Sequence, residues 1–381
     1  MPSAAVIGTG MIPFGKHPER TIVDMASEAV FQAIKDAGIK PAQVDACFFA
    51  NGFAGRLFGD MTIGQHVFWE LGINKVPVIN VENACTSGST AFYLAYNMVA
   101  AGQADIVLVA GAEKMYVPEV GLINSGETEL DTQLGLVASA GFALRAIRHM
   151  TEFGTTPQQL AQVAVKNRRH GQLNPLAQFR EPITVEEVLA SPMIVEPFTR
   201  LQCCPNADGA AAAVVCSTSM AKKLSRAVNV EAAILCTGSY ENPQDLTHWE
   251  TDYRACRLAY EKTGIGPEDL DVVECHDAFT ISEILHYEAL GLCPKGEGGK
   301  LVERGETALG GRIPVNVSGG LLSRGHPVGA TGVAQIIEIV TQLRNEAGAR
   351  QVDGAKVGLA HCMGGDKAAD TKSCTIVVLT T

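Results

Sequence analysis

The chain has 381 residues, of which 46% are hydrophobic, and a net charge of −11. This length allows two or three domain-sized units, and the acidic balance argues against a surface for nucleic acid or an anionic membrane. The eleven cysteines are odd in number and scattered through apolar segments, and no signal peptide precedes them, so we expect reduced thiols in a cytoplasmic protein. No apolar run reaches membrane-spanning length.

Short apolar strands alternate with helices in the first third of the chain, which is the pattern of an α/β protein. The elements predicted here are a strand at 4–8, an amphipathic helix at 21–37 ended by Gly38, a strand at 46–50, a loop at 51–59, a helix at 62–71, a strand at 76–81, a helix at 89–101 and a strand at 105–110. The helix at 89–101 is apolar nearly all round, so we expect it to be buried.

Cys85 lies in the small, polar turn between the strand at 76–81 and this buried helix. Unpaired N–H groups and the positive end of the helix dipole favour an anion at such a position. We therefore expect a thiol pKa below the usual value of about 8.5 and a nucleophilic thiolate. The alternative is a buried structural cysteine.

Two segments recur later in the chain in the same order, which indicates an internal duplication. Residues 38–45 are echoed by 264–271, and residues 78–81 by 314–317. Between the repeats lies a more polar region with predicted helices at 134–149 and 157–171. We divide the chain into an N-terminal half (1–116 with 201–235), an inserted loop domain (117–200) and a C-terminal half (236–381).

Three polar or glycine-rich segments of the second half contain residues that could serve Cys85. They are 274–279 with His276, 323–332 with His326, and 361–365 with Cys362. Each is predicted to follow the end of a strand, where open α/β sheets bind their ligands. Together they supply a base for the nucleophile, donors for an oxyanion and a second acid/base for a substrate carbon.

Four segments of this chain resemble the four catalytic motifs of the thiolase family and follow in the family's order. They are Cys85-Thr86-Ser87, His276-Asp277-Ala278-Phe279, Gly325-His326-Pro327 and Cys362-Met363-Gly364. The resemblance covers the whole chain. It implies the α/β thiolase fold, in which two duplicated βαβ-type halves form a five-layered α/β/α/β/α core with an inserted loop domain.

The resemblance also implies the roles of the site residues. Cys85 would take the acyl group, His326 would activate it, and Cys362 would move the α-proton of acetyl-CoA. The side chains of His326 and His276 would form one oxyanion hole, and the backbone N–H groups of Cys85 and Gly364 the other. The implied reaction is cleavage of a 3-oxoacyl-CoA by coenzyme A, or the reverse Claisen condensation. Coenzyme A is then a co-substrate, and no permanently bound cofactor and no metal is expected. The acyl group stays open.

Two features depart from most thiolases. His276 stands where most have Asn, and in this the chain resembles sterol-carrier-protein-type and archaeal-type relatives. The insertion is also short, and short-loop relatives often pair with a small zinc-ribbon/OB-fold protein, which we expect here beside a homodimer or dimer of dimers.

Three other functions were weighed against a thiolase. A ketoacyl synthase has no second catalytic cysteine such as Cys362. A thiolase-fold aldolase lacks the nucleophile that Cys85 provides. A non-catalytic acyl-CoA-binding subunit would be expected to have lost one of the site residues.

Overall fold

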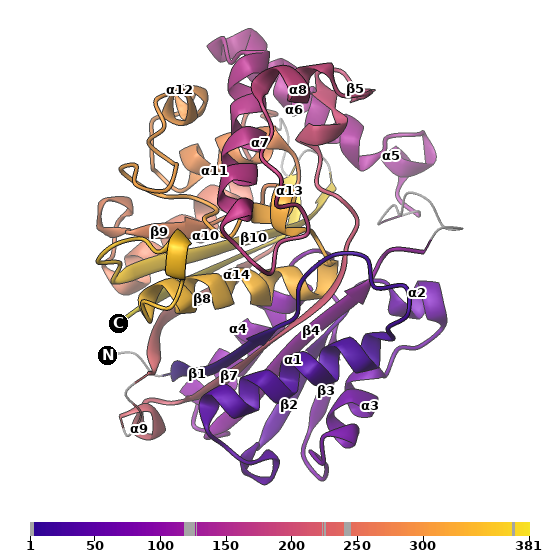
Figure 1. Ribbon diagram of the computed structural model, residues 1–381, viewed down its shortest axis with the longest axis vertical. Helices are drawn as coiled ribbons and strands as arrows, with labels where there is room; N and C mark the ends of the chain where they lie inside the picture. Colours follow the sequence, from indigo (N-terminus) through magenta and orange to yellow (C-terminus); the bar gives the residue numbers. More distant parts are fainter. Residues whose placement is uncertain are drawn as a thin grey trace.

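The computed structural model describes residues 4–117, 126, 128–222, 224, 226–239, 245–367 and 370–381, residue 367 by its backbone alone. Parts of the three predicted domains therefore lie outside the described residues, namely 1–3, 118–125, 127, 223, 225, 240–244 and 368–369. The described chain forms a nine-stranded sheet flanked by helices and a separate two-stranded ribbon (Figure 1).

The first half contributes five strands, in the spatial order β3-β2-β4-β7-β1. Their bounds are β1 (Ala4–Met11), β2 (Ala46–Ala50), β3 (Val78–Val81), β4 (Ile106–Lys114) and β7 (Asp208–Ser217). β2 runs parallel to β3 and β4, whereas β7 runs antiparallel to β4 and β1. The strands are rich in Val, Ile and Ala and are mostly buried on both faces, as expected for a sheet covered by helices on each side.

The second half continues the sheet as β8-β11-β10-β9. Counted outward from the joint between β1 and β8, these four strands correspond to β1, β7, β4 and β2 of the first half. The bounds are β8 (Val228–Cys236), β9 (Val272–Glu274), β10 (Val357–Lys367) and β11 (Asp370–Thr380). A bridge from Val273 to Val315 puts the segment 314–317 beside β9, the place that β3 takes beside β2. β1 pairs with β8 and so joins the two halves into one sheet.

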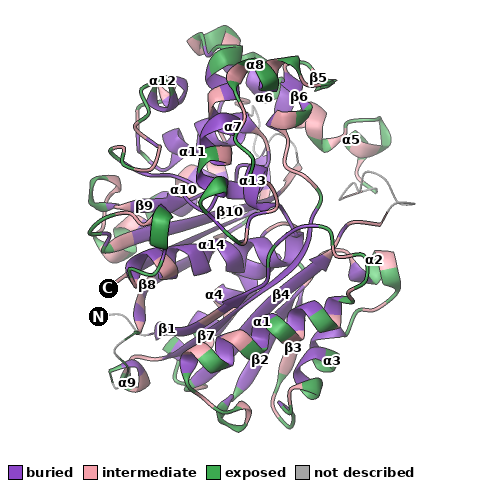
Figure 2. Cartoon of the chain, in the orientation of Figure 1, coloured by how far each residue is buried: buried purple, intermediate pink, exposed green. Residues whose placement is uncertain are grey.

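Helices form three layers around the two parts of the sheet, which gives five layers in all (Figures 1 and 2). The outer helices of the first half are α1 (Ile22–Ala37) and α3 (Ile63–Glu70), and those of the second are α10 (Glu250–Thr263), α11 (Thr280–Ala289) and α12 (Gly298–Glu303). The central layer is α4 (Ser87–Ala100) beside α14 (Val328–Leu343). The predicted α/β class, duplication and five layers are confirmed; the domain limits given above stay a prediction.

The duplicated segments have the same local structure in both halves. The α1 and α10 helices end at Gly38 and Gly264, both with positive φ, a conformation that glycine adopts without strain. Asp45 then accepts two N–H groups at the start of β4, and Asp271 accepts two at the start of β10. The sequence echo thus encodes a turn that ties the strand to its neighbour.

The inserted region interrupts the first half in sequence but packs on the second half. α7 contacts α11, α12 and α13, and Thr156 and Gln159 form a capping box at its start. The elements of this region are α5 (Leu130–Gln133), α6 (Ala138–Phe153), α7 (Pro157–Gln172), α8 (Val185–Ala190), β5 (Met193–Val195) and β6 (Phe198–Thr199). The remaining short helices are α2 (Ala54–Phe58), α9 (Thr218–Ala221), α13 (Gly320–Arg324) and the 3₁₀ turns η1 (Pro41–Gln43), η2 (Arg200–Gln202), η3 (Pro267–Asp269) and η4 (Gly348–Arg350).

Several predicted elements were wrong in detail. The helix predicted at 134–149 begins only at Ala138 and continues to Phe153 as α6, because Gly135 has a φ of 99° and separates it from α5. The loop at 51–59 contains α2. β10 continues through 361–365 to Lys367, because β11 supplies a hydrogen-bonding partner along its length. Cys362 therefore lies within a strand, and His326 lies between α13 and α14; neither follows a strand end.

Candidate active site

Cys85 is held in a tight turn between β3 and the first turn of α4. Ser87 fixes the turn, since its hydroxyl accepts the N–H of Asn83 at 2.8 Å and donates to the carbonyl of Ala84 at 2.6 Å. Ala84 has a φ of 47°, which costs energy for a residue with a Cβ and marks a constrained backbone. The turn leaves the Cys85 side chain half-buried at the N-terminus of α4.

His326 is the nearest base to this thiol. Its Nε2 lies 3.3 Å from Cys85 Sγ, and its Nδ1 lies 2.8 Å from Thr331 Oγ1. Thr331 donates its single hydroxyl proton to the carbonyl of Pro327, at 2.9 Å. Its oxygen can therefore only accept from Nδ1–H, so the tautomer is fixed and the Nε2 lone pair faces the thiol. Sequence analysis missed Thr331, although its place five residues after His326 was visible.

Cys362 and His276 complete the group from the other half of the chain. Cys362 Sγ lies 3.5 Å from His276 Nδ1 and 3.2 Å from the carbonyl oxygen of Cys85. The rings of His276 and His326 meet edge to face, 5.1 Å apart. The structure thus brings together all four predicted side chains, which come from the N-terminus of α4, the loop after β9, the start of α14 and β10.

The backbone N–H groups of Cys85 and Gly364 stay the predicted donors to an acyl oxygen. Gly364 packs closely on the cysteine turn, since an added Cβ would lie 3.0 Å from both the Asn83 oxygen and the Thr86 nitrogen. The backbone N–H groups that act on the Cys85 sulfur are those of Cys85 itself and of Gly365. Gly365 has a φ of 69°, a conformation that glycine adopts without strain.

The expected depression of the Cys85 pKa is wrong. Burial raises the pKa of this thiol to about 12, and the two backbone N–H groups only partly offset that effect. Burial also lowers the pKa of His326 to about 3 and that of His276 well below its ordinary value. Loss of solvation outweighs the helix terminus, so the resting site holds neutral thiol and neutral imidazole. The thiolate can form only as the proton moves to His326.

Glu113, at the end of β4, ties the site to the first half of the sheet. Its carboxylate accepts N–H groups from Gly52 at 2.8 Å, Phe53 at 3.1 Å and Gly329 at 3.0 Å, and an amide N–H of Asn51 at 2.9 Å. Gly329 lies in the first turn of α14, so Glu113 fixes the position of the helix that follows His326. Burial raises the pKa of Glu113 to about 7.

Buried polar side chains connect the insertion to the loop that carries His276. Asn167 of α7 donates to Asp277 at 2.7 Å and to Glu283 at 2.6 Å. Lys166 is almost fully buried, pairs with Glu283 and donates to the carbonyl of Val315 at 2.8 Å. Lys166, the first residue of the basic group at 166–169, is therefore committed inside the protein.

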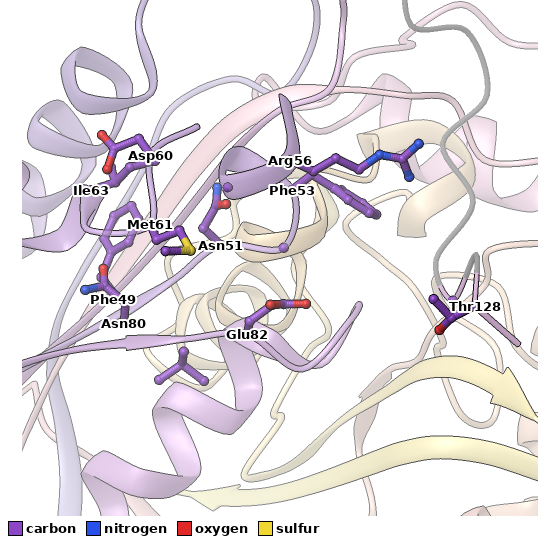
Figure 3. Close-up of a pocket in the computed structure, with 14 residues that line it drawn as sticks. Phe49, Asn51, Phe53, Arg56, Asp60, Met61, Ile63, Asn80, Glu82 and Thr128 are labelled. Atoms are coloured by element: carbon purple, nitrogen blue, oxygen red, sulfur yellow. The ribbon is translucent and has the colours of Figure 1, made fainter. Parts of the chain in front are cut away.

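A cavity of about 610 Å³ lies beside the site, at the ends of β2 and β3 (Figure 3). Asn51, Arg56, Met61, Glu82 and Thr128 are among the residues that line it. None of the four predicted catalytic side chains does, so this cavity is not where the sulfur and the imidazole meet.

Known proteins resemble this chain in both sequence and fold. Residues 4–219 match the thiolase N-terminal domain, and residues 233–379 match the thiolase C-terminal domain-like family. The acetyl-CoA acetyltransferase of Methanothermobacter thermautotrophicus is 41% identical over 96% of this chain and 97% of its own length. The benzoylsuccinyl-CoA thiolase subunit BbsB of Thauera aromatica is 40% identical over 94% of each chain.

Solved structures agree with these matches. The structure titled Ltp2-ChsH2(DUF35) aldolase has a TM-score of 0.86 and 27% identity, covering 100% of this chain and 98% of that one. Human mitochondrial 3-ketoacyl-CoA thiolase, with a TM-score of 0.76 and 17% identity, covers 100% of this chain and 99% of that one; at this identity the likeness shows the fold alone.

The fold and these matches define an acyltransferase with the thiolase fold. The chain belongs to the thiolase family, as the resemblance of its four motifs predicted. Within the described residues, no helix is both long and apolar enough to cross a bilayer.

Proposed function

We propose that this protein cleaves a 3-oxoacyl-CoA with coenzyme A, or runs the reverse condensation, through an acyl thioester on Cys85. The observation that carries the proposal is the 3.3 Å contact between Cys85 Sγ and a His326 Nε2 whose lone pair is fixed by Thr331. A nucleophile held against an oriented base is what covalent acyl transfer requires.

The chemistry balances with the residues at hand. As Cys85 sulfur attacks the keto carbon, its proton moves to His326 Nε2. The bond between the keto carbon and the α-carbon then breaks, and its electron pair stays on the acetyl-CoA fragment as an enolate. Cys362 gives its thiol proton to that α-carbon. Coenzyme A next attacks the acyl group on Cys85, and its thiol proton passes to the Cys362 thiolate. The bond between the acyl carbon and the Cys85 sulfur breaks, and that sulfur takes back the proton held on His326 Nε2.

Two oxyanion sites support this sequence. The rings of His276 and His326 converge next to Cys362, where the enolate oxygen would form, so we assign that oxygen to the two imidazoles. We assign the oxygen of the acyl group on Cys85 to the backbone N–H groups of Cys85 and Gly364, because Gly364 packs directly on the cysteine turn. Such prearranged donors act strongly in a buried site.

Two measurements test the mechanism. Incubation with an acyl-CoA, followed by peptide mass mapping, should find a labile thioester on Cys85, and label elsewhere contradicts the proposal. In Cys362→Ala, exchange of acetyl-CoA α-protons with deuterated water should vanish while Cys85 still accepts the acyl group. Exchange at the normal rate would mean that another base acts on the α-carbon. Cys47→Ala, at a buried cysteine of β2, serves as the control.

The second candidate is a thiolase-fold aldolase, which the TM-score of 0.86 to a structure so titled favours. An aldolase has no use for an acylated cysteine. Detection or absence of the Cys85 thioester therefore separates the two functions.

For the quaternary structure we propose a homodimer formed through the edge strand β3. This strand ends the sheet, and Ile79 on it is 40% exposed. An exposed edge with an apolar side chain favours pairing with a second copy.

We further propose that a small zinc-ribbon/OB-fold subunit completes the coenzyme A site. Three cations of the inserted region are committed elsewhere: Lys166 and Arg145 are buried, and Arg168 stacks on Phe179 at 4.3 Å. Phosphate recognition needs several such groups. The name of the Thauera relative as a subunit, and the double name of the aldolase structure, support a two-protein assembly.

Calorimetric titration of coenzyme A into the purified chain tests this. We expect weak binding that strengthens when the subunit is added. Micromolar binding with full turnover by the chain alone would contradict the need for a partner.

A further inference from the structure

A second group of ionisable side chains lies directly behind His276, and sequence analysis assigned it no role. It consists of Asp252 in α10, His286 in α11 and His361 in β10, each at most 1% exposed. Asp252 Oδ2 lies 2.9 Å from His286 Nδ1, and Asp252 Oδ1 lies 3.5 Å from His361 Nε2. The two imidazole rings are 4.2 Å apart.

Both imidazoles hold the backbone of His276. His286 Nε2 lies 3.0 Å from the His276 carbonyl oxygen, which can only accept, so Nε2 carries a proton. On the other side, the His276 N–H donates to His361 Nδ1 at 3.4 Å, so that nitrogen carries none. One carboxylate, through two rings, thus holds both the N–H and the C=O of His276. We refer to these three residues as the clamp.

Hydrogen-bond accounting also gives the charge of the clamp. Burial and the neighbouring His361 ring lower the pKa of His286. With Nε2–H committed to a carbonyl, however, a bare Nδ1 would face the carboxylate oxygen at 2.9 Å as two lone pairs, so we place a proton on Nδ1. His361 Nε2 carries the proton of that ring, and at 3.5 Å from Asp252 Oδ1 it makes a charge contact without hydrogen-bond geometry. Burial alone would raise the pKa of Asp252, but the two imidazoles outweigh it and hold the pKa below its usual range.

The surroundings of Asp252 favour its negative charge. It lies in the first turn of α10, where the helix dipole stabilises an anion. Arg145 of α6 is the nearby cation, and the Cys374 thiol of β11 is a hydrogen-bond partner of the carboxylate. Trp249 covers His286 from the remaining side, with ring centroids 5.3 Å apart.

A buried charge cluster of this kind is not explained by packing alone. Replacing buried ion pairs by apolar side chains is often neutral or stabilising, because taking charges out of water is costly. On the reactive side the clamp holds the backbone of His276, and its His361 directly precedes Cys362 in β10. The His276 ring in turn lies 3.5 Å from Cys362 Sγ and edge to face with His326. A group that stabilises a developing charge must be held within about 0.5 Å of its productive position.

We propose that Asp252, His286 and His361 form a positioning site for His276, needed where the enolate of acetyl-CoA forms and dispensable for loading of Cys85. This inference rests on the proposed function, since it assigns His276 to the enolate oxygen. His326 activates Cys85 without help from the clamp, because its orientation is fixed by Thr331. The two half-steps should therefore separate in clamp variants.

The same three side chains could also be considered as a metal site, because their donor atoms all lie within 4.8 Å of one another. A metal on His361 Nε2 would require the ring proton on Nδ1, where it would oppose the N–H of His276. The tautomer set by the backbone thus favours a proton-linked cluster. A stoichiometric metal found by elemental analysis of the purified protein would overturn this assignment.

The test compares Asp252→Asn with Glu250→Gln, which removes a charge from the same helical turn but from the solvent side, where Glu250 pairs with Arg254. Two rates are measured on each: acylation of Cys85 by an acyl-CoA, and deuterium exchange at the α-carbon of acetyl-CoA. We expect Asp252→Asn to slow exchange by about 10- to 100-fold, the usual effect of losing a supporting partner. Acylation should change by less than about threefold, and Glu250→Gln should change neither rate. Equal loss of both rates, or normal exchange, would overturn the proposal.

A readout independent of turnover covers the other outcomes. The proton between His286 and Asp252 should give a strongly downfield ¹H resonance in the wild type and in Glu250→Gln, and it should disappear in Asp252→Asn. If Asp252→Asn does not fold, His286→Phe, which removes the donor to the His276 carbonyl, replaces it in the rate measurements with the same expected results. A wild type that neither loads nor exchanges refutes the proposed function, whereas the resonance still reports on the clamp. Absence of the resonance in the wild type would refute the clamp itself.

Discussion

Thr331→Val is the sharpest probe of how the Cys85–His326 pair works. The substitution keeps the shape of the side chain but removes the oxygen that accepts His326 Nδ1–H at 2.8 Å. The imidazole is buried, so it must either leave this donor without a partner or move the proton to Nε2. In the second case the lone pair that receives the Cys85 proton is lost, and in both cases acyl transfer slows.

The size of the effect follows from the cost of an unpaired buried donor, about 1–3 kcal/mol. Since 1.4 kcal/mol corresponds to a factor of ten in rate, we expect acylation of Cys85 to slow by about 5- to 150-fold. Thr331→Ser keeps the hydroxyl and should stay within a fewfold of the wild type. The assay is the single-turnover rate of acyl loading, followed by mass spectrometry of the intact protein.

Thr341→Val provides the matched control. Thr341 lies in the same helix and its hydroxyl also donates to the carbonyl four residues earlier, at 2.8 Å, but it has no contact with an imidazole. This variant reports the cost of losing the backbone hydrogen bond alone. Equal loading rates for Thr331→Val and Thr341→Val would refute the tautomer argument.

Three further predictions concern stability and assembly. Burial raises the pKa of all eleven cysteines. Above pH 8.5 the unfolded chain therefore loses thiol protons that the folded chain keeps. At one pH unit above this value, each cysteine lowers the free energy of unfolding by up to ~1.4 kcal/mol. The urea midpoint under reducing conditions should be lower at pH 9.5 than at pH 7.5, and an unchanged midpoint would contradict the burial of the thiols. Lys166→Met should cost about 3–5 kcal/mol in urea unfolding because Glu283 stays buried without its cation, whereas Lys300→Met, at an exposed pair, should cost under about 1 kcal/mol. Ile79→Lys should shift a dimer to monomer in sedimentation; a dimer of normal strength would exclude the β3 edge as the interface.

Much of the architecture is predictable because it depends on neighbours along the chain. The all-round apolar sequence of α4 predicts a buried helix, and Gly38 and Gly264 predict helix ends, since each acts through local backbone geometry. The echo of 38–45 at 264–271 predicts two equivalent halves. The four motif segments likewise name Cys85, His276, His326 and Cys362 before any contact is known.

Other features depend on residues that are distant in sequence. β10 continues through Cys362 only because β11 pairs with it, and the insertion packs on the second half although it interrupts the first. Thr331 lies only five residues from His326, yet its role appears only when the imidazole and the carbonyl of Pro327 are seen together.

The charge state of the site is the property that the sequence alone predicts least well. A cysteine at a helix N-terminus predicts a thiolate, and the sequence contains nothing that opposes this. Only the tertiary structure shows that Cys85 is enclosed and that its pKa rises to about 12. The clamp behind His276 likewise joins residues 252, 286 and 361 from three separate elements. The sequence by itself determined which chemical groups are available and which segments form helices and strands, because those depend on residue type and local spacing. Solvation and proton positions were decided by the fold, because they depend on distances and burial that only long-range packing sets.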